Sequence, residues 1–241
     1  KTLDRVRYGG FLFNDDLECF DASYFGISEA EAVAMDPSQR IALEVCCEAI
    51  YNAGYTLADF KGQSVGVFMA AMASVDTDKA NPLTSPSLNS QQQSVYDVTS
   101  SSISVLAGRI SYVLGVKGPC VTLDTACSSS LVALHSARRS LQHRECDIAL
   151  VVGVGILGFN TGINTATASM TSKDGKCHTF DESANGYCRG EGCGALILKR
   201  AEDSTRDGNK VYATVCGSAV MQDGKSASLT APNGLAQQEL Y

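Results

Sequence analysis

Apolar residues recur at helical spacing in three stretches of the chain, over residues 37–53, 100–114 and 128–141. Asp36 precedes the first stretch and Pro37 opens it, which is a typical helix start signal. A glycine follows each of the first two stretches, which is a typical helix stop signal. The stripe of the first stretch consists of Ile41, Ala42, Val45, Cys46, Ala49 and Ile50. We therefore predict three amphipathic helices that each pack one face against a core.

Five shorter stretches are rich in β-branched and other apolar residues, which is typical of strands. They cover residues 65–69, 121–123, 147–152, 195–199 and 211–215. Several are continuous apolar runs, as in strands that are buried on both faces of a sheet. Strands that alternate with helices predict a layered α/β fold around a largely buried mixed sheet.

Polar stretches separate these elements. Residues 1–28 are expected to be loop-like, and Ser28 with the glutamate three residues later resembles a capping box that opens a short helix. Residues 73–93 carry prolines among many serines and predict a surface loop. We also expect a loop at residues 160–169 and a charged turn at residues 203–209.

Composition narrows the class of protein. The 241 residues are enough for one sizeable core, and 44% hydrophobic with 19% charged residues is typical of a globular domain. A net charge of -7 argues against nucleic acid or an anionic membrane as the main partner. The longest apolar run, residues 148–159, is too short for a membrane span. We expect a cytoplasmic protein; organellar targeting stays open because Lys1 is not a natural start.

The ten cysteines of the chain lack the paired spacing of a zinc site and the density of a small secreted scaffold. This pattern favours a reducing compartment. One cluster, Cys177, His178, Cys188 and Cys193, holds metal-ligating residue types. Its spacing is irregular, so thiols of no special role are favoured over a zinc site, and we expect no bound metal.

Cys127 is the candidate for nucleophilic chemistry. It lies between the predicted strand at residues 121–123 and a run of three serines that favours a helix N-terminus. Amides and the dipole at such a terminus favour a thiolate, and the same amides can stabilise an oxyanion formed on an acyl carbonyl. A buried structural cysteine is the alternative, and spacing alone leaves both open because no base is recognisable nearby.

Other motifs compete with this interpretation. Residues 62–66 match G-x-S-x-G, but a loop precedes Ser64 and the strand follows it, which is the wrong order for a hydrolase. Residues 153–158 match G-x-G-x-x-G, the dinucleotide-binding motif, but the residues that follow would make a poor phosphate-binding helix. Close backbone packing at the end of a strand is therefore the favoured interpretation of these glycines. Residues 219–226 resemble a relaxed P-loop, which must lead into a helix whose N-terminus binds the phosphates. The residues that follow leave no room for such a helix, so we interpret residues 219–226 as an exposed turn.

The three histidines, His135, His143 and His178, do not identify a base. Packing or surface exposure is the favoured interpretation for each of them.

The motif Asp-Thr-Ala-Cys-Ser-Ser-Ser-Leu at residues 124–131 resembles the active-site signature of β-ketoacyl synthases. The resemblance is to ketosynthase domains of type I polyketide synthases and their fatty-acid relatives. It extends over nearly the whole chain, because further landmarks follow in the family's order at residues 10–12, 20–28, 35–40, 180–181, 186–192 and 229–234.

The resemblance implies a thiolase-like fold, an α/β/α/β/α sandwich of two similar halves. Residues 1–241 would then be a partial ketosynthase domain, the N-terminal half without its first strand. It further implies that Cys127 accepts an acyl group, and that a malonyl-type extender loses carbon dioxide and attacks it in a decarboxylative Claisen condensation. The backbone amide of Cys127 would be the first oxyanion donor.

The implied partners are an acyl carrier protein, other synthase domains and a second copy in a homodimer, with no nucleic acid. No cofactor is expected, since substrates are carried on the carrier's phosphopantetheine. The family's two catalytic histidine motifs are absent from this sequence. A non-catalytic half-domain that binds a carrier or partner chain therefore remains the alternative. Cys46 and Cys47 stand where related sequences often carry an aromatic residue. The sequence leaves chain length open, as well as the choice between polyketide, polyunsaturated and ordinary fatty-acid products.

Overall fold

The computed structural model describes residues 2–72, 95–100, 102–157, 159–229 and 231–241. Its main sheet has four strands in the order β3 (Cys120–Leu123), β2 (Val65–Ala71), β4 (Ile148–Gly155) and β6 (Gly192–Lys199). β2 runs parallel to both of its neighbours, whereas β4 and β6 are antiparallel. The predicted mixed sheet is therefore confirmed.

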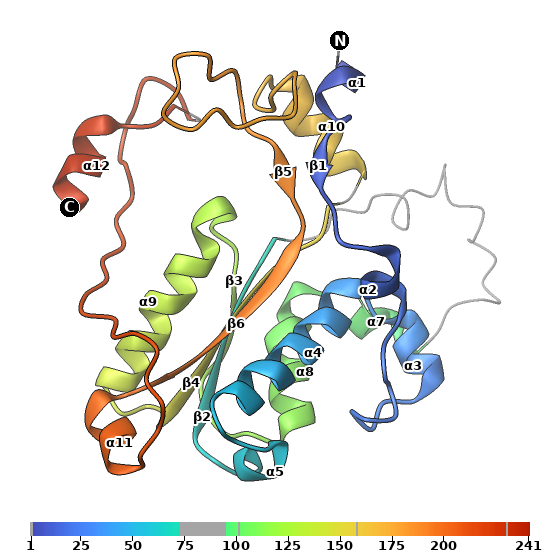
Figure 1. Ribbon diagram of the computed structural model, residues 1–241, viewed down its shortest axis with the longest axis vertical. Coiled ribbons are helices and arrows are strands. Elements are labelled where there is room, and N and C mark those ends of the chain that lie inside the picture. Colours follow the sequence, from blue (N-terminus) through green and yellow to red (C-terminus); the bar gives the residue numbers. More distant parts are fainter. Residues whose placement is uncertain (1, 73–94, 101, 158, 230) are drawn as a thin grey trace.

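Helices cover both faces of this sheet (Figure 1). α4 (Pro37–Asn52) and α8 (Ile103–Leu114) pack on one face, and α9 (Ser129–Gln142) packs on the other. The shorter helices are α1 (Thr2–Arg5), α2 (Asn14–Glu18), α3 (Glu29–Ala34), α5 (Leu57–Phe60), α7 (Asp97–Ser100), α10 (Phe159–Thr167), α11 (Ala201–Arg206) and α12 (Gly234–Leu240). No helix among the described residues has the length and apolar character needed to cross a bilayer.

The core forms two layers because successive residues of a strand point to opposite faces. Val67 and Met69 of β2 pack toward α4 and α8, while Phe68 between them packs toward α9. In the same way Leu150 of β4 faces the first layer, and Val151 faces the second. All seven residues of β2 are buried, which explains why its sequence is a continuous apolar run without alternation.

The predicted N-caps are present, but the capping box at Ser28 is only half formed, because the Glu31 side chain accepts from Arg109 Nη1 at 2.6 Å. Asp36 Oδ1 accepts a hydrogen bond from Ser38 N at 2.8 Å and caps α4, with Pro37 as its first residue. Ser28 Oγ accepts from Glu31 N at 3.2 Å and caps α3. These local contacts depend on residues close in sequence, so the pattern alone could predict them.

Four expectations about loops and strands were wrong or lie outside the described residues. Residues 1–28 contain α1, α2 and the two-residue strand β1 (Gly9–Gly10), which pairs with β5 (Arg189–Gly190). Residues 160–169 lie largely in α10 instead of a loop. Residues 211–215 form no strand, and the predicted surface loop at residues 73–93 lies outside the described residues.

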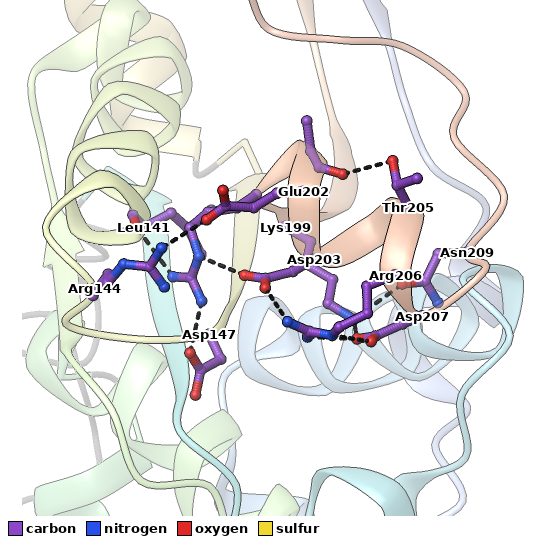
Figure 2. Close-up of polar contacts among 12 residues, drawn as sticks. Leu141, Arg144, Asp147, Lys199, Glu202, Asp203, Thr205, Arg206, Asp207 and Asn209 are labelled. Atoms are coloured by element: carbon purple, nitrogen blue, oxygen red, sulfur yellow. Dashed lines mark hydrogen bonds and ion pairs between the residues drawn. The ribbon is translucent and has the colours of Figure 1, made fainter.

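The charged turn expected at residues 203–209 is partly the helix α11, which ion pairs stabilise (Figure 2). Asp203 Oδ1 accepts from Arg206 Nη1 at 2.6 Å, and Arg144 Nη2 donates to Glu202 Oε1 at 2.7 Å. Burial alone would raise the pKa of Asp203, but hydrogen bonds from Arg200 and Arg206 outweigh burial and lower it. Asp203 in the first turn and Arg206 in the last also match the helix dipole.

Candidate active site

Cys127 lies in a short turn between a strand and a helix. β3 ends at Leu123, a single 3₁₀ turn spans Ala126–Ser128, and α9 begins at Ser129. The Cys127 side chain is exposed. The predicted position of Cys127 at a strand-to-helix junction is therefore confirmed, and the residue is exposed at the surface of the described chain.

Side chains of the neighbouring residues hold this turn in place. Ser129 Oγ accepts from Thr125 N at 2.8 Å and donates to Ala126 O at 2.7 Å. Ser128 Oγ donates to Thr125 O at 2.9 Å, and Asp124 Oδ1 accepts from Ala126 N at 3.0 Å. Two of the three serines are thus bonded to backbone groups of the turn that presents the thiol.

The residue before the cysteine has an unusual backbone conformation. Ala126 has a φ of 56°, in the left-handed region of backbone conformation that residues other than glycine rarely adopt. Such conformations cost of order 1–3 kcal/mol and persist where the surrounding contacts fix them. Here the hydrogen bonds of Ser129 and Asp124 with Ala126 supply that constraint. The sharp turn before Cys127 is therefore held at a cost in local backbone energy.

A cavity of about 610 Å³ lies beside this turn. From the turn and α9 it is lined by Thr125, Ser128 and Val132. Its opposite wall consists of residues distant in sequence: Val220, Met221, Gln222, Asp223, Gly224, Ser226, Leu229, Ala231 and Pro232. Its volume is within the usual range for small-molecule sites, and its lining mixes hydroxyl with apolar side chains. No local pattern in the sequence predicted this wall.

The opposite wall belongs largely to residues 211–229, which we name the crossing segment. Instead of joining the sheet, the crossing segment runs from α11 toward α12 (Figure 1). His135 Nδ1 and Ser218 Oγ are 3.0 Å apart, and Arg138 Nη2 donates to Cys216 O at 3.4 Å. The strand predicted at residues 211–215 was wrong, because these residues pair with no strand of the described sheets, and the residues that follow them, 216 and 218, contact α9.

No histidine is placed as a base for Cys127 within the described residues. His135 contacts Ser218, His143 Nε2 lies 3.1 Å from Arg139 Nη2, and His178 Nε2 lies 2.9 Å from Asp174 Oδ2. These contacts agree with packing and surface roles for the three histidines.

The candidate metal-ligating residues are engaged elsewhere. Cys177 Sγ accepts from Cys188 N at 3.3 Å, and His178 pairs with Asp174. Cys193 packs against the core layer that contains Cys46. Among the described residues no group of three or more His, Cys, Asp or Glu side chains is arranged to hold a metal ion.

The first two of the three competing motifs have structural explanations. Ser64 precedes β2, so the order of the G-x-S-x-G match is wrong for a hydrolase, as predicted. The second match does lead into a helix, α10, contrary to expectation. A Cβ on Gly153 would meet Ser130 Oγ at 2.6 Å, so close packing between β4 and α9 accounts for this glycine.

Two of the sequence landmarks meet through one carboxylate. Glu191 Oε2 accepts from Leu12 N at 3.0 Å, and its Oε1 accepts from Leu157 N at 3.0 Å. Glu191 N also donates to Gly10 O at 2.7 Å beside the β1–β5 pair. The landmarks at residues 10–12 and 186–192 thus form one structural unit.

The sequence profile described as "Beta-ketoacyl synthase, N-terminal domain" matches residues 3–204. The chain belongs to the β-ketoacyl synthase family. The match includes Cys127 and the turn before α9, as well as all four strands of the main sheet.

Two curated relatives that the chain matches are large polyketide synthases. The chain is 46% identical over 234 residues to a phenolphthiocerol/phthiocerol polyketide synthase of Mycobacterium tuberculosis, covering 96% of this chain and 10% of that protein. It is 45% identical over 240 residues to a type I polyketide synthase of phenolphthiocerol synthesis from Mycobacterium bovis, covering 98% of this chain and 11% of that protein. The chain thus spans about a tenth of their length.

Solved ketosynthases share the fold. The ketosynthase from module 6 of the bacillaene synthase of Bacillus subtilis 168 superposes with a TM-score of 0.82 at 37% identity, over 95% of this chain and 38% of that one. An oxazolomycin ketosynthase domain of Streptomyces albus JA3453 gives 0.83 at 33% identity, over 96% and 39%. The thiolase-like fold is therefore confirmed, and the chain spans less than two fifths of the length of these two solved chains.

Proposed function

We propose that this chain carries the acyl-accepting cysteine of a polyketide-type condensing enzyme. The observation that supports this most directly is the exposed thiol of Cys127 in a constrained turn at the start of α9, beside a cavity of about 610 Å³. A thiol so placed is accessible to a thioester, and the peptide amides at a helix start favour negative charge next to it.

In the first step the Cys127 thiolate attacks the carbonyl carbon of an acyl thioester. The resulting oxyanion accepts a hydrogen bond from the backbone amide of Cys127, and the carrier thiol leaves as the new thioester forms. Covalent capture divides the condensation into two easier steps. The side chains of Thr125, Ser128 and Val132 line the space in which the acyl thioester lies.

In the second step a malonyl-type thioester loses carbon dioxide, and its carbanion attacks the acyl-Cys127 carbonyl. A carbon–carbon bond forms, and the cysteine thiolate is released. The family's two histidine motifs for this step do not occur in the 241 residues. We expect no condensing activity from these residues alone, and measurable turnover by them in an assay with carrier-bound substrates contradicts this expectation.

The partners that we propose follow from this chemistry. The acyl donor and the extender are thioesters on the phosphopantetheine of an acyl carrier protein, other synthase domains process the product, and two copies form a homodimer. The large polyketide synthases among the relatives support a multidomain setting. No cofactor is needed for either step as written.

Acyl labelling tests the role of Cys127. The full-length natural protein that carries this sequence is incubated with an acyl-N-acetylcysteamine thioester, digested and mapped by mass spectrometry. We expect acylation of Cys127 in the wild type. The mapped peptide that contains position 127 should carry at least about a hundredfold less acyl label in Cys127→Ala, because no other nucleophile at the turn replaces a thiolate.

Cys216→Ala is the matched control, since Cys216 is also exposed but lies in the crossing segment, outside the turn. It should leave labelling of Cys127 unchanged. Equal labelling across many of the ten cysteines contradicts the proposal and favours a half-domain that binds a carrier without chemistry.

A further inference from the structure

Asp223 and Asn233 close a loop at its base. Asp223 Oδ2 accepts a hydrogen bond from Asn233 N at 2.9 Å, and Asp223 O accepts one from Asn233 Nδ2 at 2.9 Å. Asn233 Oδ1 in turn accepts from Leu235 N at 3.2 Å and Ala236 N at 3.4 Å, so the same side chain caps α12. We name the two bonds between Asp223 and Asn233 the loop clamp.

Among the described residues between the two clamp residues, 224–229 and 231–232, none is buried. Leu229 is 103% exposed, whereas Asp223 and Asn233 are half-buried. A loop with few buried contacts has low local stability, so its conformation depends on the hydrogen bonds that it does make. The loop clamp joins positions ten residues apart, and its loss frees the intervening backbone.

This loop forms much of the wall that faces the Cys127 turn. Gly224, Ser226 and Leu229 line the cavity across from Thr125 and Ser128. The two sides come from distant parts of the sequence, so the width of the cavity depends on how the loop is held. Contacts of His135 and Arg138 tie down the crossing segment at residues 216 and 218, before the loop begins.

We infer that Asp223 and Asn233 are positioning residues, whose clamp holds this loop so that its apolar side chains contact the acyl thioester beside Cys127. The inference rests on the proposed function. Asp223 also lines the cavity, whereas Asn233 does not and acts through the loop alone, and neither residue takes part in bond making. Their loss therefore weakens binding of a thioester that fills the cavity, without reducing the reactivity of the thiol toward a small reagent.

The test uses two probes on the full-length natural protein. The first is octanoyl-N-acetylcysteamine, with the acylation rate of Cys127 followed over a range of concentrations by peptide mapping. The second is iodoacetamide, which is too small to need the cavity wall. Asp223→Ala is expected to raise the half-saturating thioester concentration about tenfold and to change the iodoacetamide rate less than about twofold, given the free energy of a lost hydrogen bond.

Two further variants separate the clamp from general destabilisation. Asp223→Asn keeps an oxygen acceptor for the Asn233 amide and should restore half-saturation close to the wild type. Asn233→Ser keeps a hydroxyl to cap α12 but cannot reach the Asp223 carbonyl, so it should resemble Asp223→Ala. Hydrogen exchange of the amides of residues 224–229 should accelerate in both weakened variants.

Asp16→Ala is the matched control, because Asp16 also accepts from a backbone amide, that of Phe13, at 3.2 Å, but does not line the cavity. It should change neither half-saturation nor exchange of residues 224–229. Failure of the wild-type protein to accept the acyl group overturns the proposed function. Acylation of the wild type with unchanged half-saturation and exchange in Asp223→Ala overturns the positioning role alone.

Discussion

Ser129 is the residue on which the geometry of the Cys127 turn depends most. Its side chain is only 5% exposed, so its hydroxyl needs partners within the protein. It accepts from Thr125 N and donates to Ala126 O, so one oxygen fixes both backbone groups around the strained Ala126. A buried hydroxyl with both bonds made stabilises a conformation that the backbone would otherwise leave.

Replacement of this hydroxyl should loosen the turn. We expect Ser129→Ala to lower the free energy of unfolding by about 1–3 kcal/mol, because two hydrogen bonds are lost and their partners lie partly buried. The acylation rate of Cys127 should fall in the folded protein as the turn relaxes. Urea denaturation and thioester labelling measure the two effects.

Ser136→Ala is the control for this prediction. The Ser136 hydroxyl donates to Val132 O within α9, at 2.9 Å, a contact that adds little to helix stability. A loss of stability or labelling in Ser136→Ala equal to that in Ser129→Ala would mean that α9 as a whole, and not the turn, is affected.

Individual helices owe their bounds to particular end residues. α8 ends at Leu114 and is capped by Gly115, whose φ of 64° lies in the left-handed region and whose amide donates to Ser111 O and Tyr112 O. Gly108 lies within the same helix, and a Cβ built on it meets nothing within 4 Å. The same residue type thus has opposite consequences at the end and in the middle of one element.

This contrast predicts mutations of opposite sign. Gly115→Ala should destabilise the protein by about 1 kcal/mol, because a Cβ is unfavourable in the left-handed region. Gly108→Ala should stabilise it by about 0.5–1 kcal/mol, because alanine restricts the unfolded chain and fits the helix. Thermal unfolding of the two variants beside the wild type measures both, and a shift in the same direction for both contradicts the prediction.

Short helices depend on partners more than on their own sequence. α10 forms over a Thr- and Asn-rich segment of weak helix propensity and packs against α1, and α11 forms within a charged segment whose Glu202 accepts a hydrogen bond from Arg144, outside the helix. The crossing segment begins with the pattern of a strand and forms none there. Propensity is a weak guide in such segments, since tertiary neighbours outweigh it.

At the scale of the whole molecule the fold divides the cysteines by environment. Cys46 and Cys146 are buried, whereas Cys127 and Cys177 are exposed. Burial raises the pKa of Cys193 to about 12 because the thiolate loses its solvation, and it raises that of Cys46 as well. The core therefore keeps these thiols protonated and unreactive while the turn exposes Cys127.

This burial predicts a loss of stability in alkali. Because the pKa of Cys193 is higher in the folded than in the unfolded protein, its contribution is complete below about pH 9 and is lost as the pH rises toward 12. By pH 11 the loss from this group should reach about 1–3 kcal/mol. Urea denaturation of the wild type and Cys193→Ala at about pH 8.5 and about pH 10.5 measures it.

The expected result is a steeper fall of stability with pH in the wild type than in Cys193→Ala. Cys216→Ala serves as the control, since its thiol is exposed and its removal should leave the wild-type slope unchanged. Identical slopes in the wild type and Cys193→Ala contradict the prediction.

The sequence by itself determined the strand-to-helix junction at Cys127, the three long helices, the Asp36 cap of α4, the buried strands β2 and β4, and the family. These features arise from contacts between residues near in sequence or from a periodic pattern, both of which are visible along the chain. Only the tertiary structure decided that Asp223 and Asn233 bring a distant loop across from Cys127, and that residues 211–215 leave the sheet. Such placements depend on which elements become neighbours after folding, and no local pattern carries that information.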